Sequence, residues 1–225
     1  MTPGAALAEL EARANPAKAA DMARYHKAKR RYLGLANPTI DALCKEWRAE
    51  MALDARVTLA AGLWDSDVFE ARIAAGKLFT QARIRPDDAV WAEICRWMPM
   101  LDSWAIADQV ASAGARRLTA EPARLETVAD WTTDPNKWVR RAALVFTLPW
   151  AKLPHPNAVQ TAERERILGW AEGYATDHDW FIQKAIGWWL RTLSRHDAAR
   201  VIAFTDAHGD KLKPFALREA LRSLP

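Results

Sequence analysis

Trp104 and Asp108 are the two residues of this sequence whose types and spacing best suit chemistry. They lie four residues apart in a segment with a helical pattern, so their side chains share one face of a helix. An aromatic face beside a carboxylate can stabilise a cation. The alternative interpretation is a packed core tryptophan next to a solvated acid. If the pair is catalytic, we expect a reaction whose transition state is cationic.

The commoner catalytic and metal-binding motifs are absent from the sequence. There is no Gly-rich phosphate loop, no His-Glu-x-x-His and no Gly-x-Ser-x-Gly. Cys44 and Cys95 are isolated, so we expect two free, buried thiols and no metal site. The Asp177–Asp179 run lies at a predicted joint and is more typical of a helix cap than of a metal site. We therefore expect no metal and no cofactor.

The composition permits a basic surface that faces a polyanion, because 32 Lys and Arg oppose 28 acids and the pI is about 9.2. The twelve tryptophans exceed what a compact core needs, so we expect some of them to face a ligand. No apolar run approaches the roughly 18 residues of a membrane span. Glu9 and Glu11 lie where a signal peptide would be apolar. We expect a cytoplasmic protein that does not bind membranes.

Helical periodicity covers almost the whole chain, and no alternating run is long enough for a strand. Most joints carry Pro or an Asp, Asn, Ser or Thr cap. The sequence therefore predicts an all-α protein that forms a single domain over residues 1–225. The expected helices cover approximately residues 2–14, 16–30, 38–49, 54–64, 66–80, 86–98, 102–117, 121–131, 136–148, 156–173, 178–194, 196–206 and 213–223.

Four of the expected helices begin with an aromatic residue, and the four aromatics are Phe69, Trp104, Trp138 and Phe181. Their offsets of 35, 34 and 43 residues suit HEAT or armadillo helical hairpins. Polar residues follow three or four positions later, and these are Arg72, Asp108, Arg141 and Lys184. Taken singly, each pair is a core staple beside a solvated edge. Taken together, they predict an α-solenoid of antiparallel HEAT-like helix pairs curved around a concave basic groove, with Asp108 as its one acid.

Basic residues on the C-terminal helices are placed to grip phosphates, and these are Arg140, Arg141, Lys184, Arg191 and Arg218. Tryptophans interleave with them and can stack on bases or lie against sugars. In the Trp188–Trp189 pair the two side chains point about 100° apart. We expect Trp188 to face the groove and Trp189 to pack in the core. A nucleic acid is the ligand that suits this set.

Five stretches of the chain carry a family resemblance: Asn15–Tyr25 with Tyr32–Leu35, Ser103–Trp104 with Asp108, Trp138–Ala143, Phe181–Arg191, and Arg218–Ala220. In these stretches the chain resembles the AlkD-like DNA alkylation repair family of HEAT-like-repeat DNA glycosylases. The likeness spans nearly the whole chain, and Phe181–Trp188 is its most specific stretch.

The resemblance implies a DNA glycosylase that excises N3- and N7-alkylated purines, such as 3-methyladenine and 7-methylguanine, from double-stranded DNA without base flipping. It implies that Asp108 is the catalytic aspartate, that Trp104 and Trp188 contact the damaged nucleotide, and that Arg141 is the functional arginine. Further DNA contacts are expected from Tyr25, Arg140, Lys184, Arg191 and Arg218. We expect a monomer that is associated with the nucleoid when it is bound to alkylated DNA.

The charge of the alkylated purine fits this set of residues, because a cationic base leaves without protonation. Stabilisation of an oxocarbenium-like deoxyribose then remains. Three positions depart from the family pattern: Ala36 replaces a Gln, Ser103 replaces a second Trp, and Pro149 replaces a phosphate-contacting Lys. These departures bear on substrate range and DNA affinity. Two alternatives stay open, a non-catalytic α-solenoid that binds damaged or branched DNA and a protein-binding HEAT scaffold, although a scaffold would need apolar groove positions where this sequence has Arg and Lys.

Overall fold

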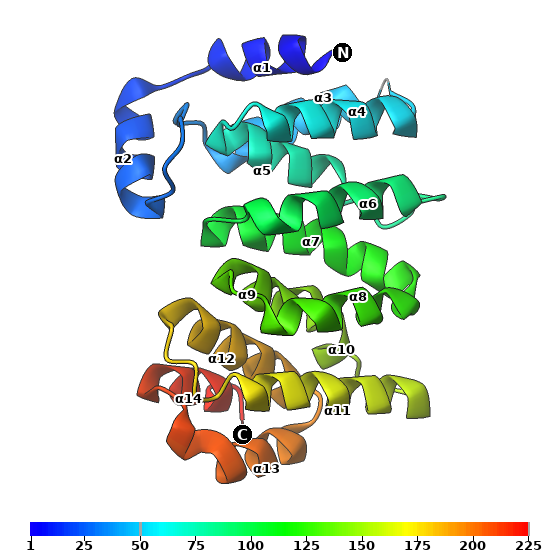
Figure 1. Ribbon diagram of the computed structural model, residues 1–225, viewed down its shortest axis with the longest axis vertical. Helices are drawn as coiled ribbons and strands as arrows, with labels where there is room; N and C mark the ends of the chain where they lie inside the picture. The colour runs from blue at the N-terminus through cyan, green and yellow to red at the C-terminus, as the bar shows by residue number, and fades with distance from the viewer. Residues whose placement is uncertain (50, 225) are drawn as a thin grey trace. The chain divides into compact units, whose positions relative to one another are not determined.

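The computed structural model describes residues 1–49 and 51–224, and the regular secondary structure of these residues is helical (Figure 1). A single isolated parallel bridge joins Arg31 and Val68 in this described part. The predicted all-α class is confirmed. The α-helices are α1 (Pro3–Glu11), α2 (Pro16–His26), α3 (Asn37–Ala49), α4 (Leu53–Asp65), α5 (Phe69–Leu78), α6 (Asp88–Trp97), α7 (Trp104–Ala120), α8 (Leu125–Asp130), α9 (Lys137–Phe146), α10 (Leu148–Ala151), α11 (Ala158–Gly173), α12 (Trp180–Ser194), α13 (Ala198–His208) and α14 (Pro214–Leu221).

Each expected helical stretch contains a helix, but some ends differ from the prediction. The helix expected over 16–30 ends at His26, because Lys27 takes a left-handed conformation with φ 59° and its N–H bonds to the Ala23 carbonyl. The stretch expected over 121–131 is split into the 3₁₀ turn Pro122–Arg124 and α8. These are local breaks that hydrophobic periodicity does not register.

The chain forms two compact units, Met1–Ala120 and Glu121–Pro225. In the first unit α5 packs against α3, α4 and α7, and α1 packs against α4. Its core is built on stacked aromatic rings: Trp64 lies 4.5 Å from Trp97, and Phe79 lies 5.4 Å from Trp97. All three side chains are fully buried. Part of the high tryptophan content is therefore ordinary core.

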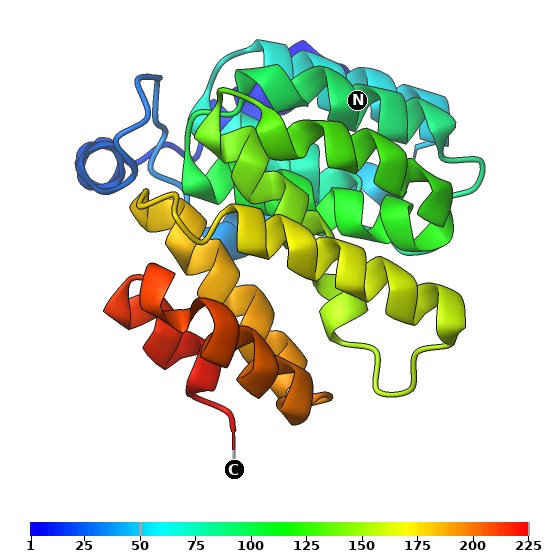
Figure 2. The same ribbon diagram turned by 60° about the horizontal axis from the view of Figure 1, so that its bottom comes forward.

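Helix α2 lies to one side of α3 and α5 in Figures 1 and 2, and none of its residues is buried. It begins with Pro16 after an Asn15 cap that accepts from the Lys18 N–H. The Asn15 N–H also donates to the Leu33 carbonyl at 2.7 Å. The position of α2 therefore depends on the segment that follows it, residues 27–36, and not on a buried face of its own.

In the second unit α12 packs against α9, α13 and α14, and Figure 2 shows α13 and α14 beside it. A Cβ at Gly187 would lie 2.9 Å from the Ala216 carbonyl oxygen, so glycine allows α14 its close approach. Trp189 and Phe146 are fully buried in this unit.

Candidate functional site

Trp104 and Asp108 line one pocket of about 260 Å³ in the first unit. Trp104 is the first residue of α7, and Asp108 follows one turn later on the same face. Both residues are partly exposed. Helices α2, α3 and α5 supply the remaining walls, among them His26, Phe69 and Glu70. Trp104 and Asp108 therefore share one cavity.

An aromatic cluster surrounds the Trp104 ring. The ring centroid of His26 lies 5.2 Å from that of Trp104, and the centroid of Tyr25 lies 5.9 Å away in an edge-on arrangement. Phe69 packs against His26 at 4.5 Å and against Tyr32 at 4.6 Å. Tyr25 is 69% exposed. The structure thus brings Tyr25, a predicted DNA contact, beside the predicted catalytic Trp104.

Glu70 is a second carboxylate in this pocket, and the sequence analysis missed it. Its side chain is fully buried, and it accepts hydrogen bonds from the backbone N–H groups of Leu33, Gly34 and Leu35 at 2.9, 2.7 and 3.3 Å. These bonds compensate the carboxylate and hold the chain that follows α2. The sequence does contain one signal for this role: Glu70 is an acid that follows Phe69 in a helix of otherwise mostly apolar residues, so a buried and hydrogen-bonded carboxylate could have been expected there.

Gly34 is required at the centre of this anchor. Its φ of +80° is a left-handed conformation, and a Cβ there would lie 2.2 Å from the Asn15 carbonyl oxygen. The Tyr32–Leu35 stretch therefore has a structural function. It ties the start of α2 to the start of α5, and it thereby places Tyr25 and His26 against α7.

An ion-pair network supports the start of α7. The buried Arg30 guanidinium bonds Asp67 at 2.6 Å and also bonds Asp102, two residues before Trp104. Arg72 joins the network through Asp67 at 2.9 Å and donates to the Met100 carbonyl. Arg72 is only 7% exposed, and burial lowers its pKa.

These contacts correct part of the predicted repeat pattern. Arg72 is a buried structural residue and presents no charge to a groove. Asp108 also follows its aromatic by four residues, whereas Arg72, Arg141 and Lys184 follow theirs by three, so the four polar residues do not occupy one equivalent position. Positions three and four after a reference residue lie about 100° apart on a helix.

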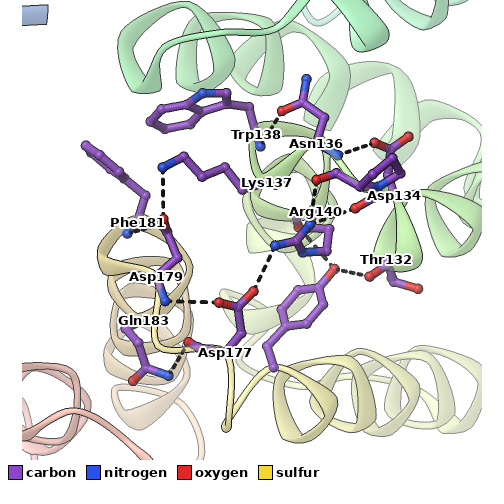
Figure 3. A network of polar contacts seen from close by, with 12 residues as sticks. Thr132, Asp134, Asn136, Lys137, Trp138, Arg140, Asp177, Asp179, Phe181 and Gln183 are labelled. Carbon is purple, nitrogen blue, oxygen red and sulfur yellow. Dashed lines mark hydrogen bonds and ion pairs between the residues drawn. The ribbon is translucent and has the colours of Figure 1, made fainter. Parts of the chain in front are cut away.

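In the second unit Arg140 belongs to a polar network between α9 and the 174–179 segment (Figure 3). It donates to Asp177 at 2.9 Å and to the Asp134 carbonyl at 2.7 Å, while the Tyr174 hydroxyl donates to the Arg140 carbonyl at 3.2 Å. Burial raises the pKa of Tyr174, which keeps the phenol protonated. Arg140 is thus engaged within the protein, and its predicted DNA contact stays a prediction.

Lys137 and Asp179 extend this network to the first turn of α12, as Figure 3 shows. Burial would raise the pKa of the Asp179 carboxyl, but the hydrogen bonds from Lys137 at 2.8 Å and from the Phe181 N–H outweigh it and lower that pKa. Lys137 also lies over the Trp138 ring, 5.2 Å from its centroid, and Trp138 packs on Phe181 at 4.6 Å. The two aromatic starts of this unit are therefore paired.

Arg141 is 3% exposed and donates to the Phe181 carbonyl at 2.7 Å. It was predicted to hold a phosphate. In the structure its side chain links α9 to the first turn of α12, and a phosphate contact stays a prediction.

The remaining predicted residues of this unit differ in how far they are already engaged. Arg191 forms an ion pair with Glu219. Lys184 and Arg218 are exposed. Trp189 is fully buried whereas Trp188 is partly exposed, as predicted. Lys184, Arg218 and Trp188 are the members of the set that are available to a ligand from this unit.

Over the described ranges, 1–49 and 51–224, no group of three or more His, Cys, Asp or Glu is placed to hold a metal ion. In the same part of the chain, no helix has the length and apolar character of a membrane span. The predicted cap at Asp177–Asp179 is confirmed, since the Asp179 side chain accepts from the Phe181 N–H.

Comparison with known proteins yields matches among solved structures and one family. A predicted DNA alkylation repair enzyme from Enterococcus faecalis has a TM-score of 0.78 at 24% identity, over 94% of this chain and 97% of that chain. The smu.31 protein of Streptococcus mutans UA159 has a TM-score of 0.61 at 15% identity, over 84% and 92%. AlkD2 from Streptococcus mutans has a TM-score of 0.59 at 14% identity, over 84% and 91%.

These likenesses confirm the predicted HEAT-like helical fold. No curated protein matches the sequence. The model of the DNA alkylation repair enzyme family matches residues 6–224, which confirms the family that the sequence resembles. The chain therefore belongs to the DNA alkylation repair enzyme family.

Proposed function

We propose that this protein is a DNA glycosylase that excises positively charged N3- and N7-alkylated purines from duplex DNA without flipping the base. The observation that carries the proposal is the shared pocket of Trp104 and Asp108, beside the exposed Tyr25, in a member of a DNA repair family. An aromatic face and a carboxylate at one cavity suit a cationic sugar better than they suit a nucleophilic or metal-assisted reaction.

In the proposed reaction the bond between deoxyribose C1′ and the purine nitrogen breaks, and its electron pair neutralises the cationic purine. Positive charge develops on the sugar, and the Asp108 carboxylate stabilises it. Water then adds to C1′ and releases a proton to Asp108 or to solvent. Because the base already carries its charge, this scheme needs no general acid.

The tryptophans supply the second part of the mechanism. The electron-rich face of Trp104 lies against the developing sugar cation and contributes about 0.5 to 2 kcal/mol if ordinary cation–π energies apply. We assign a contact with the damaged nucleotide to Trp188, which is partly exposed. Tyr25 and the exposed Lys184 and Arg218 contact the DNA backbone.

We assign Arg141 to fixing the register of the DNA. Its hydrogen bond to the Phe181 carbonyl supports a role through the first turn of α12, which carries Lys184 one turn later. For a direct phosphate contact, another N–H group of the Arg141 guanidinium would have to point toward the DNA.

The test is release of free base. Purified protein is incubated with methylated genomic DNA, and 3-methyladenine and 7-methylguanine are quantified against a protein-free control. Release in proportion to time supports the proposal. Binding of the same DNA without release identifies the non-catalytic alternative, and the absence of salt-sensitive DNA binding contradicts both.

A further inference from the structure

His26 occupies the centre of the aromatic cluster at the candidate site. It is the last residue of α2, and it lines the same pocket as Trp104, Asp108 and Glu70. Its ring lies 4.5 Å from Phe69 and 5.2 Å from Trp104. Among the described residues that line this pocket, His26 is the one whose charge ordinarily changes near neutral pH. The proposed reaction does not use it.

One ring nitrogen of His26 is buried without a hydrogen-bond partner. The described residues place no acceptor or donor within bonding distance of Nδ1. A buried N–H without an acceptor is costlier than a buried lone pair, so we assign the proton of the neutral ring to Nε2. Protonation of the ring would place a new N–H at Nδ1 where nothing accepts it. The surroundings thus favour the neutral form.

The charged and titratable groups around His26 come from four elements. Tyr25 lies on its own helix, Tyr32 on the following segment, Glu70 on α5 and Asp108 on α7. Burial disfavours the charged imidazolium and lowers the pKa of His26 below its ordinary value of 6.5.

We infer that His26 is a positioning residue: its neutral ring packs against Trp104 and adds no positive charge to the pocket that Asp108 lines. Protonation of His26 would add a positive charge to this pocket and would weaken its stabilisation of a cationic sugar. This inference rests on the proposed glycosylase function. An imidazolium in the pocket that Asp108 lines would oppose the development of positive charge on the sugar, and it would repel the cationic purine.

The first experiment is the pH profile of single-turnover excision from DNA that contains 7-methylguanine, at saturating protein and corrected for spontaneous depurination. Because no general acid is needed, the wild-type rate should be constant above neutrality and fall about tenfold per pH unit below the His26 pKa. His26→Phe keeps an aromatic ring without a titrating group, so its rate should stay flat. His155→Phe is the matched control, since His155 is exposed in the loop before α11, and it should keep the wild-type profile.

Two further variants separate charge from packing. His26→Gln is smaller and neutral, so it should lose rate at every pH but show no acidic fall. His26→Lys carries a permanent charge, so it should be slow at every pH. An acidic fall that persists in both His26→Phe and His26→Gln, or a wild-type rate that falls at no higher pH than the rate of His26→Phe, would overturn the inference.

A binding experiment keeps the inference testable without catalysis. The probes are two matched oligonucleotides, one with a protonated pyrrolidine in place of the sugar and one with neutral tetrahydrofuran. Wild type should prefer the pyrrolidine at pH 7.5 and lose that preference as the pH falls through the His26 pKa, while His26→Phe keeps it over the same range. If no base is released but this preference holds, the glycosylase proposal fails and the His26 inference stands. A wild-type preference that is absent at pH 7.5, or that falls on acidification no more than the preference of His26→Phe does, overturns the inference.

Discussion

The hydrogen bonds of Glu70 are predicted to hold the segment that follows α2 against α5, next to the candidate site. Glu70→Ala removes the acceptor of the Leu33, Gly34 and Leu35 N–H groups. Hydrogen bonds to a charged group each contribute about 1.5 to 3 kcal/mol. The Leu35 bond is long at 3.3 Å, and the adjacent pocket lets water reach part of the gap, so we expect about 3 to 5 kcal/mol in total.

Thermal unfolding measures this loss. In a chain of this size one kcal/mol corresponds to about 2 to 4 °C, so the melting temperature of Glu70→Ala should fall by roughly 10 °C. Glu70→Gln should fall less, because its amide oxygen can still accept the Gly34 and Leu35 bonds. Glu46→Ala, an exposed acid on α3, is the control and should change the free energy of unfolding by less than about 0.5 kcal/mol.

Amide hydrogen exchange locates the effect. The Leu33, Gly34 and Leu35 amides should exchange slowly in the wild type and quickly in Glu70→Ala. A melting temperature within about 2 °C of the wild type would refute the anchoring role. A large loss that leaves these three amides protected would refute the mechanism given for it.

Three further predictions concern single residues. Gly34→Ala should lower the free energy of unfolding, measured in urea, by more than about 2 kcal/mol. The reason is that the Gly34 backbone is left-handed and the new Cβ would lie 2.2 Å from the Asn15 carbonyl oxygen. A smaller loss would show that the segment relaxes. Trp189→Ala should lose about 3 to 5 kcal/mol of stability, whereas Trp188→Ala should lose mainly DNA affinity, and equal melting temperatures would contradict the burial difference. Cys44 is buried as expected, whereas Cys95 is only partly buried, contrary to the expectation of two buried thiols. Burial raises the pKa of Cys44 to about 12, so at pH 8 its thiol stays protonated and should react with a disulfide reagent only after unfolding, while Cys95 reacts in the native state. Rapid reaction of both thiols in the native protein would contradict this.

The sequence predicted the fold class and the helix starts because both depend on local signals. Apolar periodicity marks helices, and the aromatic starts recur at repeat spacing at Phe69, Trp104, Trp138 and Phe181. The pairing of Trp104 with Asp108 is also local, since one helical turn separates them. Helix geometry also predicted that Trp188 and Trp189 differ in burial, but it did not determine which of the two rings is the accessible one.

Contacts between distant segments were not predictable in this manner. In the sequence, little apart from its mostly apolar neighbours distinguishes Glu70 from the other acids. Its role follows from the fold, in which the backbone N–H groups of Leu33, Gly34 and Leu35 donate to its carboxylate. Its position in the repeat pattern predicts that Arg72 is a cation of the groove. In the fold its guanidinium instead pairs with Asp67 and donates to two backbone carbonyls. A charged residue at a repeat position can bind a ligand or bind its own chain, and periodicity does not distinguish the two.

The Asp108 carboxylate is the most direct test of the proposed function. Asp108→Asn keeps the size of the side chain and removes its charge, and Asp206→Asn on α13 is a matched exposed control. Single-turnover release of 7-methylguanine from methylated duplex should fall at least about 100-fold in Asp108→Asn, with DNA affinity and melting temperature close to wild type. Release by Asp108→Asn at the wild-type rate, from a protein of unchanged stability, would contradict the catalytic role of the Trp104 and Asp108 pocket.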